Sequence, residues 1–398
     1  MKQFLVAAAL LVGSSLFALL LGEVGARLVL SAESTAPADL SAKLNVSAQA
    51  APEQIPDTSN LRGLIQPSSN PEVVYELRPR VQGKFLGKSF RFNSLGMHDD
   101  EVSLEKPSNT VRVVGIGDSV MFGWGVEQNE NYFEIVENFL NSEPARAADG
   151  GKRFEFINLG TPGYNTTMEV ALLESKGMQL SPDVVVLHFV NNDWAVPQFM
   201  ERPKDYWAWN RSFLYEVLRE RVAPAGNTAD LVRVNANMNA QDDVVEQYRY
   251  MLGRSGFTAA MERLAKLTTT ADGKRIPVII LSGSKTSEQR QVLTQLCPSL
   301  GFHLTNVGPF VEAYFASKTP RPTPKERRKL MTVSDKDPHP NALGHRLYAQ
   351  ALFAKLQELQ IAPAGLSLPI DVGTVTLPQF GAQSSAQSSA NVDSDDTL

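Results

Sequence analysis

The segment Val111–Val126, VRVVGIGDSVMFGWGV, constrains the fold of this chain more than any other. Its first six residues are mostly β-branched, which predicts a short buried strand. The strand stops at Gly117-Asp118-Ser119, and a glycine-spaced segment with helical character follows it. We therefore expect Ser119 at the carboxyl end of a strand, where open α/β sheets place their reactive groups.

The rest of the chain alternates strand and helix candidates around this segment. Further strands are expected at Phe154–Asn158, Val184–Phe189, Val278–Leu281 and Phe302–Asn306. Helices are expected at Tyr132–Leu140, Thr167–Gly177, Phe257–Thr268, Ser287–Cys297 and Ala342–Leu359. The alternation predicts an α/β fold, a three-layer α/β/α sandwich around a mostly parallel sheet.

The amino terminus carries a compartment signal. Its uncharged apolar run, Phe4–Gly22, is about as long as the roughly 20 residues that a membrane-spanning helix needs, and it exceeds a usual secretory core. We expect residues 1–30 to be an uncleaved signal anchor, with a cleaved signal peptide as the alternative. The first reading gives a single-pass protein of the cell membrane with its main domain extracytoplasmic (periplasmic), and the second gives a secreted one.

Composition excludes several classes of function. The net charge is −5 and no basic block exceeds Lys325–Lys329, so we expect no nucleic-acid partner. Cys297 is the only cysteine, which excludes an intramolecular disulfide and a multi-cysteine metal site.

Shifts in composition suggest domain boundaries. Residues 31–70 are rich in Ala, Ser, Pro and Asn and are expected to form a flexible linker. The main domain is expected at 71–361, with a small β extension at 71–108 and an insertion or lid at 194–256, where the alternation lapses. Residues 362–398 are expected to be a disordered tail, since their end is rich in Gln, Ser, Ala and Asp.

A nucleophilic serine needs a base, and one histidine stands out as a candidate. His339 lies in Ser334–Asn341, SDKDPHPN, just before the last predicted helix. An acid directly upstream of a histidine on a proline-flanked turn can accept from the imidazole Nδ1–H and fix the tautomer. The alternative is an exposed histidine in an ordinary turn before a helix.

Two strand ends offer donors for an oxyanion. Asn191-Asn192-Asp193 follows one predicted strand, and an asparagine amide there can stabilise an oxyanion by roughly 3–4 kcal/mol. Asn158–Asn165, NLGTPGYN, follows another, and its glycines can bring a backbone N–H close to a substrate. Either segment could instead be an ordinary turn.

In this order, the four motifs resemble those of the SGNH, or GDSL-type, hydrolases. The matching residues are Gly117-Asp118-Ser119, Gly163, Asn192 and Asp337-Pro338-His339, and the resemblance spans about Val111–Leu359. The segment Asn93–Gly96 and the apolar amino terminus are similar to those of a membrane-anchored bacterial branch of the family.

The resemblance implies a flavodoxin-like sheet and a role for each matching residue. Ser119 would be the nucleophile and His339 the base, while the N–H groups of Ser119 and Gly163 and the Asn192 amide would form the oxyanion hole. The family's acid usually stands three residues before the histidine, and that position is Lys336 here. We predict Asp337 as the acid, with Asp335 as the alternative. A triad completed by an acid from elsewhere in the chain, or a dyad that uses a backbone carbonyl, is also compatible with the sequence.

The resemblance also implies a function. We expect an extracytoplasmic serine esterase that acts through an acyl-enzyme, uses no cofactor or metal, and binds an acyl ester of a small molecule, lipid or glycan. An O-acyltransferase or deacetylase acting on a cell-envelope polysaccharide, and an inactive surface protein of the same fold, are the alternatives. Trp124 and Tyr164 lie close enough in sequence to line the pocket, but we interpret both as core residues. We interpret His188 as a structural histidine, with a second catalytic base as the alternative, and His345 as structural too.

Overall fold

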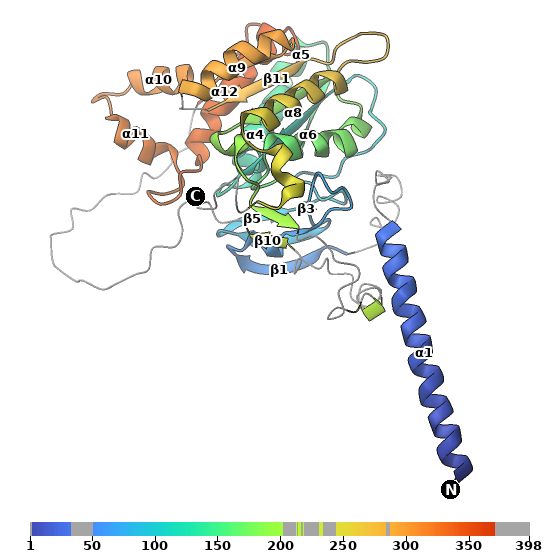
Figure 1. Cartoon of the computed structure of the whole chain (residues 1–398). Helices are drawn as coiled ribbons and strands as arrows, with labels where there is room; N and C mark the ends of the chain where they lie inside the picture. The colour runs from blue at the N-terminus through green and yellow to red at the C-terminus, as the bar shows by residue number, and fades with distance from the viewer. Residues whose placement is uncertain are drawn as a thin grey trace, which may run out of the picture.

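The structure, a computed structural model, describes residues 2–32, 51–201, 231–233, 244–283 and 287–370, together with residues 212, 214, 215 and 218. A parallel sheet forms the centre of the main body, and helices cover both of its faces (Figure 1). Small sheets from the amino-terminal part of the chain lie beside this body.

The central sheet contains five strands: β6 (Thr110–Gly117), β7 (Arg153–Asn158), β8 (Val184–Phe189), β11 (Val278–Ser282) and β12 (His303–Asn306). Their order is β12-β11-β8-β6-β7, and all neighbours run parallel. After β6, the next strand β7 is added on one side of it, and β8, β11 and β12 are then added in turn on the other side. A topological switch point results between β6 and β8, where open α/β sheets bind ligands beyond their strand ends.

Two layers of helices enclose the sheet. On one face lie α4 (Tyr132–Leu140) and α12 (Ala342–Glu358), and on the other lie α6 (Thr166–Ser175), α8 (Gly253–Leu267) and α9 (Ser287–Ser299). Successive side chains along a strand point to opposite faces of the sheet. In β6, Val113 therefore belongs to the hydrophobic core on the side of α4 and α12, and Val114 to the core on the side of α6, α8 and α9. The predicted α/β/α architecture is confirmed.

Shorter elements connect these layers. The helical ones are α3 (Ser119–Phe122), η2 (Gln128–Glu130), α5 (Glu143–Ala148), η3 (Gly177–Leu180), η4 (Asn191–Trp194), η6 (Glu246–Met251), α10 (Gly308–Ala316) and α11 (Pro324–Met331). The strand β9 (Phe199–Glu201) pairs antiparallel with β10 (Leu231–Arg233). Most of the predicted insertion at 194–256 lies outside the described residues, so its role as a lid stays a prediction.

The amino-terminal part of the body is more ordered than the sequence suggested. One small sheet joins β1 (Glu53–Thr58), β4 (Val81–Phe85) and β5 (Lys88–Arg91), and another joins β2 (Ile65–Pro67) and β3 (Tyr75–Leu77). Residues 51–70, which we assigned to the linker, therefore contain two strands and the short helix η1 (Leu61–Gly63). The strand β1 is mostly polar, so no alternation of apolar residues predicts it. It forms by pairing with β4, which lies far along the chain. Residues 33–50 lie outside the described residues.

The carboxyl-terminal boundary also differs from the expected one. Ala362 and Leu368 are buried against the core that contains α12. Gln350 and Gln357 of α12 donate to the carbonyls of Leu368 and Leu366. Residues 362–370 therefore belong to the folded body, and residues 371–398 lie outside the described residues.

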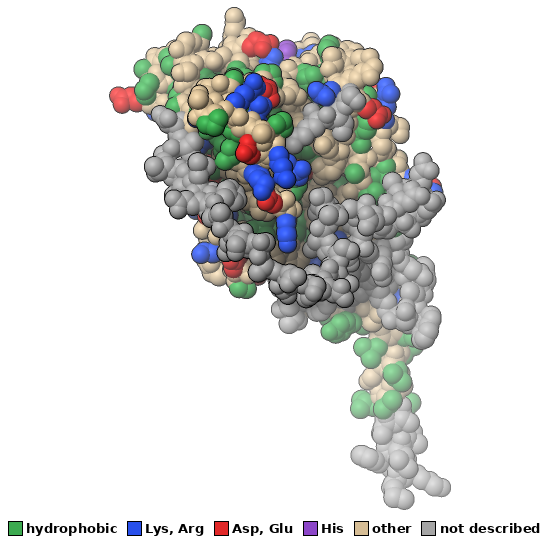
Figure 2. All heavy atoms as spheres, turned by 90° about the vertical axis from the view of Figure 1, so that its left-hand side faces the viewer, with side chains coloured by type: hydrophobic (Ala, Val, Ile, Leu, Met, Phe, Trp, Pro, Cys, Tyr) green, Lys and Arg blue, Asp and Glu red, His purple; other side chains and the backbone are tan. Residues whose placement is uncertain are grey.

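The apolar amino-terminal run forms one long helix, α1 (Lys2–Ala32). Its segment Leu10–Leu28 is long and apolar enough to cross a membrane, a test that signal sequences also pass. In the described part of the narrow stalk that this helix forms below the body, large hydrophobic side chains between Leu10 and Leu28 are exposed (Figure 2).

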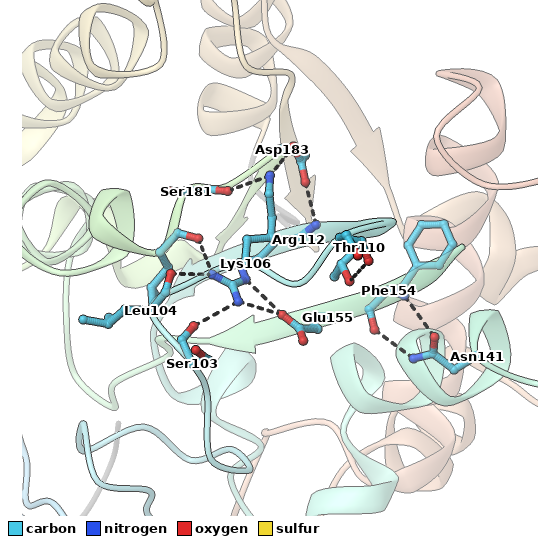
Figure 3. A network of polar contacts seen from close by, with 12 residues as sticks. Ser103, Leu104, Lys106, Thr110, Arg112, Asn141, Phe154, Glu155, Ser181 and Asp183 are labelled. Atoms are coloured by element: carbon cyan, nitrogen blue, oxygen red, sulfur yellow. Dashed lines mark hydrogen bonds and ion pairs between the residues drawn. The ribbon is translucent and has the colours of Figure 1, made fainter. Parts of the chain in front are cut away.

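A buried arginine ties together the amino-terminal ends of the central strands (Figure 3). Arg112 of β6 is fully buried and forms an ion pair with Glu155 of β7 at 2.8 Å. It also donates to the carbonyls of Ser103 and Leu180, at 3.0 and 2.6 Å. This network stabilises the end of the sheet opposite Ser119, because removing either partner of the buried ion pair would leave an uncompensated charge.

Candidate active site

The turn after β6 fixes the position of Ser119. Asp118 caps the short helix α3, accepting a hydrogen bond from the Val120 N–H at 3.0 Å. Ser119 is the first residue of that helix, with 8% of its surface exposed, and the helix ends at Gly123 in the left-handed region. A cap that satisfies an otherwise free N–H keeps such a sharp strand-to-helix turn in one conformation.

Ser119, His339 and Asp337 form an uninterrupted chain of polar contacts. The Ser119 Oγ lies 2.8 Å from His339 Nε2, and His339 Nδ1 lies 2.6 Å from Asp337 Oδ1. Since the carboxylate accepts from Nδ1–H, Nε2 is free to accept the serine proton. The sequence separates Ser119 from His339 by 220 positions, and the fold brings them into contact.

Trp124 contacts both His339 and Asp337. Its ring stacks on the His339 imidazole, with centroids 5.0 Å apart, and its Nε1–H donates to Asp337 Oδ2 at 3.0 Å. The core interpretation of Trp124 is therefore incomplete, because this half-buried ring lines the site. Its place five residues after the serine was the sequence signal for the pocket-lining alternative.

Asp337 is held in its charged form. Partial burial raises the pKa of this carboxyl, but hydrogen bonds from the His339 ring, the His339 backbone and Trp124 outweigh it and lower the pKa below its usual range. A carboxylate that stays ionised next to an imidazole stabilises the imidazolium that forms when the base takes a proton.

The alternative acid lies elsewhere on the same turn. Asp335 is exposed and forms an ion pair with Lys329 of α11 at 2.8 Å. The turn is closed by hydrogen bonds from Ser334 N–H to Asp337 O and from Val333 N–H to His339 O. The structure thus brings Asp337, and not Asp335, to His339.

Asn192 lies next to the serine. Its amide donates to Asp118 Oδ2 at 3.0 Å, and the same oxygen is 3.1 Å from Ser119 Oγ. An amide nitrogen carries two hydrogens, so one remains for a bound oxyanion. Asp118 therefore aligns both Ser119 and Asn192.

The Gly163 peptide completes a set of possible oxyanion donors. Gly163 has φ = +80°, and a side chain here would clash with Gln198, so the position requires glycine. Thr161 N–H donates to Gly117 O at 3.0 Å, which ties this loop to the serine turn. Within the described parts of the chain, nothing accepts from the Gly163 N–H, and the Ser119 N–H begins a helix without an intrahelical acceptor.

His188 and His345 lie in the core behind the site. His188 Nδ1 is 2.9 Å from the Tyr132 hydroxyl, and His345 Nδ1 accepts from the Tyr132 N–H at 3.2 Å. Burial lowers the pKa of both histidines to about 3, so both are neutral. In the described ranges, no cluster of three or more His, Cys, Asp or Glu residues is arranged to hold a metal ion.

Two adjacent residues of the amino-terminal extension support the serine helix from below. The His98 Nδ1–H donates to Phe122 O of α3 at 2.8 Å, and Asp99 Oδ2 accepts from the Asn158 N–H at 2.7 Å. Asn158 in turn donates to Met121 O. Burial lowers the pKa of His98 to about 4 and raises that of Asp99 to about 8, so both are neutral in the folded protein near pH 7. Sequence reasoning did not single out either residue.

The Asp99 carboxyl should make the protein less stable as the pH rises. Its folded-state pKa is about 8 against an ordinary value of 3.8, so its stabilising contribution is complete below pH 3.8 and is lost as the pH rises through about 8. Within that window one such group costs at most about 1.4 kcal/mol per pH unit, or about 3 °C in Tm. Asp99→Asn should flatten the fall in Tm between pH 6 and 8, measured by thermal denaturation.

The exposed neighbour of Asp99 provides the control for this measurement. Asp100→Asn should keep the wild-type slope, because the Asp100 side chain is exposed. Below pH 6.5 the opposite trend is expected from His98, whose neutral folded form is lost to protonation as the pH falls to about 4. An Asp99→Asn variant with the wild-type slope above pH 6 would contradict the assignment.

Comparison with known proteins gives only distant similarity. No protein-family model matches the chain, and no curated protein does. Among solved structures, LAE5, an alpha/beta hydrolase enzyme from the metagenome of Lake Arreo, is 14% identical with a TM-score of 0.35, covering 62% of this chain and 95% of its own. The acetyl xylan esterase AlAXEase is 16% identical with a TM-score of 0.36 (61% and 98% covered), and a Clostridium thermocellum family 3 carbohydrate esterase is 11% identical with a TM-score of 0.35 (63% and 96%).

Proposed function

We propose that this protein is a serine esterase of the SGNH type that hydrolyses carboxylic esters through an acyl-enzyme at Ser119. The observation that carries the proposal is the unbroken chain from Ser119 Oγ to His339 Nε2 and from His339 Nδ1 to Asp337, with contacts of 2.8 and 2.6 Å. This arrangement supplies a nucleophile, a base and an orienting acid in the geometry that acyl transfer needs.

In the first half-reaction, Ser119 Oγ attacks the ester carbonyl carbon while its proton moves to His339 Nε2. The carbonyl oxygen becomes an oxyanion, for which the N–H groups of Ser119 and Gly163 and the free Asn192 amide hydrogen are the donors. Collapse of this intermediate breaks the carbon–oxygen bond of the ester. The alcohol leaves with the proton from His339, and the acyl group stays on Ser119.

In the second half-reaction, water replaces the alcohol. His339 removes a proton from water, whose oxygen attacks the acyl carbon, and then returns that proton to Ser119 Oγ as the acid is released. The carboxylate of Asp337 stabilises the imidazolium in both halves. The chemistry needs no metal, because proton transfer and hydrogen bonding supply every step.

The location of this activity is part of the proposal. We place the catalytic domain outside the cytoplasmic membrane, held by α1 as a single-pass anchor. The length and apolar surface of Leu10–Leu28 support a membrane span. The acyl substrate would then be a molecule of the cell envelope or its surroundings.

A covalent probe tests the nucleophile directly. Full-length protein in detergent should react with a fluorophosphonate at Ser119, seen as a single adduct on the Ser119 peptide by mass spectrometry. Hydrolysis of p-nitrophenyl acetate should fall in proportion to the fraction of Ser119 that is labelled as the probe is titrated, because both reactions use the same hydroxyl. Heat-denatured protein, in which His339 no longer lies beside Ser119, is the control and should remain unlabelled.

Two outcomes would overturn the proposal. Folded protein that does not react with the probe would indicate an inactive protein that keeps the fold. Probe on another serine, with hydrolysis unchanged, would indicate a different active site.

A further inference from the structure

Tyr75 of β3 reaches from the amino-terminal extension to the loop that contains Gly163. Its side chain is fully buried, and its ring packs edge-on against Tyr164 and Phe199, with centroids 5.0 and 5.4 Å away. Its hydroxyl donates to the carbonyl of Pro162 at 2.8 Å. This contact joins residues 87 positions apart and comes from an element outside the central sheet.

The accepting carbonyl belongs to a particular peptide unit. The C=O of Pro162 and the N–H of Gly163 are part of the same planar group, and in a trans peptide they point in opposite directions. A hydrogen bond that holds the carbonyl on one side therefore fixes the direction of the N–H on the other. The next peptide is held as well, because Gly163 O accepts from the Gln198 N–H at 2.8 Å.

The backbone before Tyr75 adopts a conformation that costs free energy. Val74 has φ = +64°, a left-handed conformation that is a genuine outlier for a β-branched residue. Its N–H donates to Asn70 O, and Tyr75 N–H donates to Val73 O at 2.7 Å, which turns the chain sharply into β3. Strained backbone of this kind persists where the surrounding structure imposes it, and it is concentrated at functional sites.

We propose that Tyr75 is a positioning residue for the oxyanion hole: through the Pro162 carbonyl, it aims the Gly163 N–H at the oxygen of the substrate. The inference rests on the proposed esterase function and assigns part of that function to the amino-terminal extension. Tyr75 itself touches no reacting atom. Its effect should appear in the transition state, where the oxyanion forms, and not in binding of the ground-state ester.

Tyr164 provides a matched control. It is buried in the same aromatic contact, and its hydroxyl donates to the backbone carbonyl of Tyr75, not to the Pro162–Gly163 peptide. Tyr75→Phe and Tyr164→Phe thus each remove one buried hydroxyl and its hydrogen bond to a carbonyl while keeping the ring, and Tyr164→Phe also removes a contact with the Thr161 side chain. Only the first change removes a hydrogen bond of the Pro162–Gly163 peptide.

The test compares kcat and KM of both variants for p-nitrophenyl acetate, per site titrated with the fluorophosphonate, so that misfolded protein does not count. Removing a whole oxyanion donor costs about 10²–10³-fold in kcat. Tyr75→Phe should cost a part of this, about 10- to 100-fold, with KM within twofold. The inhibition constant of a trifluoromethyl ketone, which forms an oxyanion on Ser119, should rise by a similar factor. Tyr164→Phe should stay within threefold of wild type in all three quantities.

The outcomes separate this inference from the function on which it rests. Wild-type protein without hydrolysis or titratable sites would overturn the esterase function. Active wild type with equal losses in the two variants, with a change confined to KM, or with an unchanged Tyr75→Phe would overturn the positioning role alone. A kcat loss in Tyr75→Phe, matched by weaker ketone binding and absent from Tyr164→Phe, supports it.

Discussion

Ser119→Ala should lower kcat for hydrolysis of p-nitrophenyl acetate about 10⁶-fold, which is the loss seen when a serine hydrolase loses its nucleophile. The methyl group cannot form the acyl-enzyme, and the remaining oxyanion donors can assist only direct attack by water. The measurement is steady-state hydrolysis by full-length protein in detergent, compared with the rate in buffer. The expected residual rate is above that of buffer, because the Asn192 amide and the Gly163 N–H stay in place.

A double variant checks that Ser119 acts as a unit with its base. Since Nε2 of His339 works only through the serine hydroxyl, Ser119→Ala combined with His339→Ala should be no slower than Ser119→Ala alone. Circular dichroism should show both variants folded, because neither side chain is a large part of the core. Additive losses, or more than a few per cent of activity in Ser119→Ala, would contradict the assigned mechanism.

Asp337→Asn should lower kcat about 10⁴-fold, the effect of replacing the acid in such a triad by its amide. Asp337 receives hydrogen bonds from the His339 ring, the His339 N–H and Trp124 on its two oxygens. An amide has one oxygen, so its NH₂ group must face at least one of these donors. If it faces His339, the imidazole adopts the wrong tautomer and Nε2 can no longer accept the serine proton.

Asp335→Asn is the matched control on the same turn. It removes an exposed ion pair with Lys329, an interaction worth at most about 1 kcal/mol in stability. Its kcat should remain within threefold of wild type at pH 7. If Asp335→Asn lost activity and Asp337→Asn kept it, the acid would be the other carboxylate. If both variants kept wild-type activity, His339 would work without an acid.

Local pattern was enough to predict the layers of this fold. The β-branched runs of β6, β8 and β11 are buried on both faces, so each reads as an apolar segment of strand length. The apolar periodicity of α4 extends across the whole helix, and the regularly spaced Leu343, Leu347, Leu352 and Leu356 of α12 are all buried. By contrast, β1 is mostly polar and exists through pairing with β4, which no local pattern reveals.

The residues of the site also fall into those that local pattern predicts and those that depend on the folded structure. Ser119, Asn192 and Gly163 follow strands, and the parallel order of the sheet sends their strand ends to one edge. The choice between Asp337 and Asp335 depends on the direction of each side chain within a short turn, which spacing along the chain does not encode. Tyr75 and His98 contact the site from the amino-terminal extension, and Trp124 contributes through the plane of its ring. Such long-range contacts become visible only once the chain is folded.

The order of these segments along the chain has a consequence for synthesis. Ser119, the proposed nucleophile, lies in the first third of the polypeptide, whereas His339, its proposed base, is synthesised late, in the turn before α12. Until that turn has docked, Ser119 carries an ordinary alcohol that no group deprotonates. Under the proposed mechanism, a nascent chain is therefore inert toward esters, and reactivity begins only when the last helix closes over the sheet.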